Sequence, residues 1–198
     1  MSDDAAADPL SRSGPRPAAG GSGAAESPAA PRRRISHGPV TVDVADERAA
    51  ASGARPPMVL ELDRWGRLAA AAAHDEGVRR PAEMGLRFVD EAVISELAGR
   101  WLDSPRPTDV LAFPVEAPSR RPGRRIGGGP PLLVGDVVVC PSVAARGARA
   151  AGRPPEDELA LLVVHGVLHL LGHDHAGRIE SRRMRRRTRA LLARHDRV

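Results

Sequence analysis

Residues 165–175 have the sequence HGVLHLLGHDH and hold four of the seven histidines of the chain. His165 and His169 lie four residues apart in an apolar segment that favours a helix, so both side chains leave the same face one turn apart. Gly172 suits a left-handed turn that ends the helix, after which the chain can bring His175 back toward the same point. This spacing predicts that three neutral imidazoles bind one metal ion.

Three histidine ligands with an open fourth position are typical of a catalytic zinc site rather than of a closed structural one. We therefore expect one Zn²⁺ per chain, which would lower the pKa of its bound water and supply hydroxide near neutral pH. His173 directly follows the glycine and is expected to point to solvent rather than to bind the metal. Asp174 has two open interpretations: it orients a ligand histidine, or it caps the next helix.

The same histidine spacing occurs in the metzincin peptidases, in which a glutamate after the first histidine acts as the general base. This chain has Gly166 at that position. Glycine carries no group that can move a proton, and nothing in the sequence marks a substitute. The motif thus predicts the metal site without the base of the peptidase, and another metal-dependent hydrolase is left as an alternative.

The remaining sequence predicts one α+β domain over residues 38–198, preceded by a tail. Residues 1–37 contain 24 Ala, Gly, Pro and Ser and show no apolar periodicity, so we expect them to be disordered. Strands are expected at 40–44, 86–89, 109–113 and 132–140, and helices at 58–77, 91–102, 141–151, 154–172 and 177–195. This order predicts a mixed four-stranded sheet with helices packed on it, in which the zinc-site helix is followed by a C-terminal helix.

The composition excludes several classes of protein. All 30 basic residues of the 198 are arginine, and the net charge is +5. Without lysine, the chain has neither a Schiff-base lysine nor a P-loop. The lone Cys140 excludes an internal disulfide and a cysteine-cluster zinc site. No apolar run reaches the roughly 18–20 residues that span a bilayer, so we expect a soluble cytoplasmic protein that does not contact a membrane.

Two groups of arginines are candidates for contacts with RNA phosphates. They are Arg120, Arg121, Arg124 and Arg125 in a Pro- and Gly-rich loop, and Arg182, Arg183, Arg186 and Arg187 in the last helix. The alternative for the helix is a solvated face in a chain that uses arginine throughout. The aromatic residues fall in core-like patterns, so no base-stacking surface is expected. These residues are Trp65, Phe88, Trp101 and Phe113.

Three blocks of this sequence resemble the YbeY family, the single-strand-specific endoribonucleases of bacterial rRNA maturation. Residues 165–175 match the family signature HGxLHLxGxDH at every fixed position. Residues 107–114, PTDVLAFP, resemble the block PTDVLSFP, and residues 135–140, GDVVVC, resemble a third block. The resemblance covers about residues 38–195.

The resemblance implies an α+β fold in which the zinc helix packs on a mixed sheet, and zinc ligands at His165, His169 and His175. It also implies cleavage of rRNA, with processing of the 3′ end of the small-subunit rRNA and a role in ribosome quality control. The partners implied are rRNA, the small ribosomal subunit and a ribosome-assembly GTPase.

This chain departs from the family at one position connected with catalysis. Many members carry an arginine six residues before the threonine of the PTDVLSFP block, where this chain has Leu102. Arg100 and Arg106 are the nearby candidates to supply the charge, and Asp174 is a further catalytic candidate. The substitution also supports a third hypothesis, a ribosome-assembly factor that acts by binding and whose zinc is largely structural.

Overall fold

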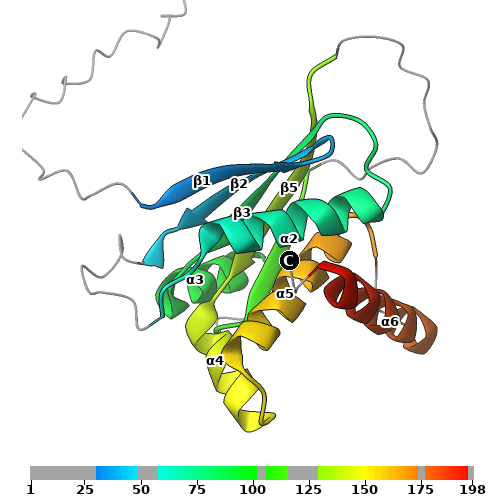
Figure 1. The fold of residues 1–198 in the computed structure, drawn as a ribbon. Coiled ribbons are helices and arrows are strands. Elements are labelled where there is room, and N and C mark those ends of the chain that lie inside the picture. The colour runs from blue at the N-terminus through cyan, green and yellow to red at the C-terminus, as the bar shows by residue number, and fades with distance from the viewer. Residues whose placement is uncertain (1–29, 49–57, 102–105, 116–128, 174–176, 196–198) are drawn as a thin grey trace, which may run out of the picture.

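The computed structural model describes residues 30–48, 58–101, 106–115, 129–173 and 177–195. The strands are β1 (Arg32–His37), β2 (Val40–Asp46), β3 (Ala82–Phe88), β4 (Val110–Pro114) and β5 (Leu132–Val139). The helices are α2 (Leu62–Asp75), α3 (Glu91–Trp101), α4 (Pro141–Ala150), α5 (Pro155–Leu170) and α6 (Arg178–His195). The α+β class and the final pair of helices are as predicted (Figure 1).

The strands form one mixed sheet in the order β1-β2-β3-β5-β4. The three central strands, β2, β3 and β5, are parallel. The two outer strands, β1 and β4, run antiparallel to their neighbours. The sheet is therefore mixed, as expected, but it has five strands rather than four.

The additional strand is β1, which corrects the expected tail of residues 1–37. It pairs with β2 from Arg32 opposite Ala45 to His37 opposite Val40. Only Ile35 of this strand is even partly buried. An edge strand of this kind is held mainly by its backbone hydrogen bonds, so it needs little apolar sequence of its own. Residues 1–29 lie outside the described residues.

Helices α2 and α5 cover one face of the sheet, and α3 packs on part of the other (Figure 1). Alternate residues of β2 supply the core beneath α2, because side chains in a strand alternate between the two faces. On the second face, Ile94 and Ala98 of α3 pack with Leu111 of β4 and Val138 of β5. This second face is thus covered by a helix at its β4–β5 end.

The histidine-bearing helix α5 lies in the centre of the protein. It contacts β4 and β5 on one side and α2, α4 and α6 on the others. Its residues Leu159, Val163 and Val167 are all almost completely buried. Such a helix is held rigidly, which suits a site that needs fixed ligand positions. Among the described residues, the structure shows no helix with the length and apolar character to cross a membrane.

Candidate metal centre

His165 and His169 lie side by side on α5, as the spacing predicted. Their ring centroids are 4.7 Å apart, and the ring planes meet at 87°. Both side chains are half-buried. Two imidazoles that approach so closely on a buried helix are arranged to share one ligand, and neutral imidazole is a preferred zinc ligand.

Gly166, between these histidines, packs directly against the sheet. A Cβ atom at this position would lie 2.5 Å from Cγ1 of Val137 in β5 and 3.4 Å from Cγ2 of Val110 in β4. Glycine therefore lets α5 approach the sheet closely. A glutamate here would have to displace a core valine, so the general base of the metzincins does not fit this packing.

The helix ends in a glycine turn, which confirms the predicted stop. Gly172 has a φ of +79°, a left-handed conformation that glycine adopts without strain. Its N–H donates to the carbonyl of His169, and the N–H of His173 donates to the carbonyl of Leu168, both at 3.0 Å. This pair of bonds is a Schellman motif, which turns the chain sharply at the end of the helix.

His173 does not point to solvent, in contrast to the prediction. Its Nε2 atom lies 2.9 Å from Oε2 of Glu76, and the two side chains are 17% and 8% exposed. Glu76 directly follows α2, so this contact ties the glycine turn to a different helix. Sequence patterns missed it because the partners are 97 residues apart.

The third predicted ligand, His175, and Asp174 lie outside the described residues. Among the residues that are described, no three His, Cys, Asp or Glu side chains lie close enough together to hold a metal ion. The paired imidazoles of His165 and His169 nevertheless fit zinc in their donor chemistry and in their closeness on one helix face. The three-histidine site stays a prediction.

The candidate catalytic arginines lie near the ends of α3 and β4. Arg100 is exposed on the last turn of α3, and its guanidinium carbon lies 5.8 Å from the ring of Trp101. Arg106 is exposed and precedes β4. Leu102 lies outside the described residues.

The candidate RNA-binding arginines differ in their exposure and in their contacts. Those of the loop, Arg120, Arg121, Arg124 and Arg125, lie outside the described residues. On α6, three are exposed, namely Arg182, Arg183 and Arg186. Arg187 is instead half-buried and forms an ion pair with Glu76. It also donates to the carbonyl of Asp75 at 3.2 Å, so it fastens α6 to α2.

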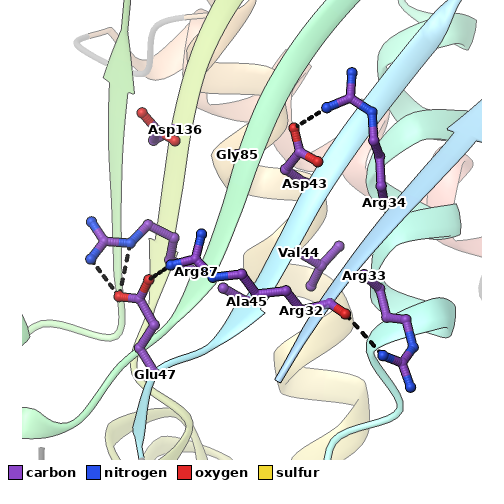
Figure 2. A pocket seen from close by; sticks show the side chains of 10 residues that line it. All are labelled: Arg32, Arg33, Arg34, Asp43, Val44, Ala45, Glu47, Gly85, Arg87 and Asp136. Atoms are coloured by element: carbon purple, nitrogen blue, oxygen red, sulfur yellow. Dashed lines mark hydrogen bonds and ion pairs between the residues drawn. The ribbon is translucent and has the colours of Figure 1, made fainter. Parts of the chain in front are cut away.

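A charged hollow of about 610 Å³ lies on the second face of the sheet, away from the histidines (Figure 2). Arg87 and Arg32 both pair with Glu47, and Arg34 pairs with Asp43 at 2.8 Å. The contact with Glu47 raises the pKa of Arg87. Sequence reasoning missed this surface because β1 falls within the expected tail; the run of three arginines at its start was the available signal.

The fold and the site together define a small α+β protein with a histidine pair on a helix packed against a mixed sheet. Comparison with known proteins identifies the family. Residues 60–196 match the family model described as Endoribonuclease YbeY. The chain belongs to the YbeY family.

Two curated relatives illustrate the extent of the similarity. Endoribonuclease YbeY of Beutenbergia cavernae is 45% identical over 136 residues, which cover 69% of this chain and 89% of that protein. Endoribonuclease YbeY of Thermobifida fusca is 42% identical over 154 residues, which cover 78% of this chain and 93% of that protein. A solution structure of TM1509 from Thermotoga maritima has a TM-score of 0.44 and 24% identity, and it covers 67% of this chain and 82% of that one.

Proposed function

We propose that this protein is a zinc-dependent endoribonuclease that cleaves single-stranded RNA. Its proposed substrate is rRNA, with processing at the 3′ end of the small-subunit rRNA and a role in ribosome quality control. One observation carries the proposal: His165 and His169 lie side by side, within the segment that matches a family of endoribonucleases. The proposed partners are the small ribosomal subunit and a ribosome-assembly GTPase, and the proposed location is the cytoplasm.

In this proposal His165, His169 and His175 hold the zinc ion. A bound zinc ion would supply Lewis acidity toward a phosphate oxygen and toward water. The protein contributes the positions of the ligands. Close packing at Gly166 fixes α5 on the sheet, and the contact of His173 with Glu76 fixes the turn that leads toward His175.

Peptide hydrolysis is less well supported. A metzincin-like mechanism needs a carboxylate next to the first histidine, and the position of Gly166 against Val137 leaves no space for one. The assembly-factor hypothesis shares the metal site with the nuclease hypothesis. It differs in predicting RNA binding without cleavage.

The decisive experiment combines metal analysis with RNA cleavage. The wild-type protein should contain about one zinc per chain and should cleave an unpaired RNA, and a chelator should abolish the cleavage. His169→Ala should lose both zinc and cleavage, because two remaining histidines rarely retain the ion. His37→Ala, which removes an exposed histidine at the end of β1, is the matched control. If the wild-type protein contains zinc but does not cleave RNA, the assembly-factor hypothesis is favoured over the nuclease hypothesis.

A further inference from the structure

Trp101, at the end of α3, is 62% exposed, although its spacing in the sequence is that of a core residue. The helix buries Ile94 and Ala98 against the sheet, and Trp101 lies beyond the end of this buried row. A tryptophan that leaves most of its ring in water forgoes a large part of its hydrophobic stabilisation. Its position is therefore not explained by packing.

The exposed ring is held in place by its neighbours. Phe113 of β4 contacts it edge to face, with ring centroids 6.1 Å apart. The guanidinium of Arg100 lies 5.8 Å from the centre of the ring. Phe113 is half-buried, so it supports Trp101 from the side of the protein. The result is a supported aromatic ring next to a cationic group, the combination that binds bases in single-stranded nucleic acids.

This ring and the histidine pair lie on the two sides of one edge strand. In β4, Val110 and Ala112 pack with the core beneath α5, whereas Leu111 and Phe113 pack with α3. Val110 also lies near Gly166 of α5, since a Cβ atom at Gly166 would lie 3.4 Å from Cγ2 of Val110. Phe113 is three residues farther along, about 10 Å in an extended strand. A flexible single strand of RNA that crosses this edge of the sheet would therefore pass both Trp101 and the histidine pair.

We propose that Trp101 is a stacking site for one unpaired base of the RNA substrate, with Phe113 as its support and Arg100 as a contact for the adjoining phosphate. This inference rests on the proposed function. It adds a binding site for the RNA on the face of β4 that packs with α3. A base is favoured over a protein partner because a stable protein interface buries about 800 Å² on each side, far more than a single ring offers.

Fluorescence gives the first test, because the chain contains two tryptophans and the other, Trp65, is 2% exposed in the core. Titration of the wild type with an unpaired RNA oligonucleotide should quench the emission of the exposed tryptophan. A duplex of the same sequence should quench it far less, because its bases are already stacked. The emission of Trp101→Leu, which comes from Trp65, should not respond to the RNA.

Binding to RNA with single abasic positions gives the second test. Trp101→Leu should weaken binding roughly tenfold, within the range for one base stacked on an aromatic ring, whereas Trp101→Phe should retain most of the affinity. One abasic position should weaken wild-type binding to a similar extent. The same abasic position should reduce the affinity of Trp101→Leu only slightly further. The missing base and the missing ring are the two partners of one stacking contact, so their effects are not additive. Val59→Ala, at another strongly exposed apolar residue, is the matched control.

The outcomes separate this inference from the proposed function. Wild-type protein that neither binds nor cleaves RNA would overturn the proposed function. Wild-type protein that cleaves RNA, together with a Trp101→Leu variant of unchanged affinity, would overturn the stacking site alone. The stacking site would also be overturned if, at every position tested, the losses of affinity caused by Trp101→Leu and by the abasic position simply added up.

Discussion

Glu76, directly after α2, lies 2.9 Å from His173, which follows the glycine turn of the histidine helix. The same carboxylate pairs with Arg187 of α6. One buried side chain thus joins α2, the turn and α6. Because His175 lies two residues beyond His173, this contact sets the starting point of the segment that carries the third predicted zinc ligand.

Glu76→Gln should therefore weaken both stability and zinc binding. The substitution removes the carboxylate that forms an ion pair with Arg187 and contacts His173 at a buried position, which costs about 1–3 kcal/mol. Urea denaturation would measure the loss, and competition with a chelator would measure zinc affinity. Glu83→Gln is the control, because Glu83 pairs with Arg34 at a partly exposed site where such pairs contribute little. Equal effects of the two substitutions would contradict this account.

Asp75, the last residue of α2, should make stability depend on pH. A hydrogen bond from His195 lowers the pKa of Asp75, and the charge of Arg194 adds to this against the opposing effect of burial. A lowered pKa in the folded state gives stability that is present above the unfolded-state pKa and is lost as the pH falls through the folded value. The free energy of unfolding should thus fall below about pH 4.

The variant Asp75→Asn should be less stable than the wild type at neutral pH and should lose less stability on acidification. Urea denaturation between pH 3 and 7 would measure both effects. Asp63→Asn removes an exposed carboxylate from the first turn of the same helix and is the matched control. Parallel pH profiles for the wild type and Asp75→Asn would show that this carboxylate does not contribute as described.

Gly166→Ala and Gly147→Ala should change stability in opposite directions. At Gly166 the new methyl group meets Val137 at 2.5 Å, so α5 or the sheet must shift at a cost of about 1–3 kcal/mol. At Gly147, in the exposed face of α4, the methyl group meets nothing within 4 Å. There the higher helix propensity of alanine should add about 0.5–1 kcal/mol. Thermal unfolding measures both, and stabilisation by Gly166→Ala would contradict the close packing.

The sequence allowed the helix of the site and its turn to be predicted because both depend on local spacing. His165, His169 and Gly172 fall within three helical turns. The strand β1 was not predictable in this way, because Arg32–Arg34 are exposed and only Ile35 of the strand is partly buried. Its place in the sheet depends on backbone pairing with β2, which leaves no apolar pattern.

The positions of Trp101 and His173 show a second limit. Helical spacing places Trp101 on the same face as Ile94 and Ala98, but Trp101 at the end of α3 is 62% exposed and contacts Phe113 only edge to face. His173 is fixed by Glu76, which belongs to a distant part of the chain. Periodicity indicates which side of an element is apolar, whereas exposure at its end depends on the neighbouring elements.

The exposed arginines of α6 should bind RNA through its phosphates rather than its bases. Replacement of Arg182, Arg183 and Arg186 by Gln should weaken binding to unrelated single-stranded sequences alike and reduce the slope of log K against log salt by about 0.7 for each phosphate that is no longer neutralised. Zinc content should not change, because the predicted ligands precede α6. Arg187 is kept in this variant because its pairing with Glu76 holds α6 to α2, and its replacement would confuse binding with stability. The test is RNA binding measured over a range of salt concentrations. If the variant keeps the affinity and the slope of the wild type, this face of α6 is only solvated and does not bind RNA.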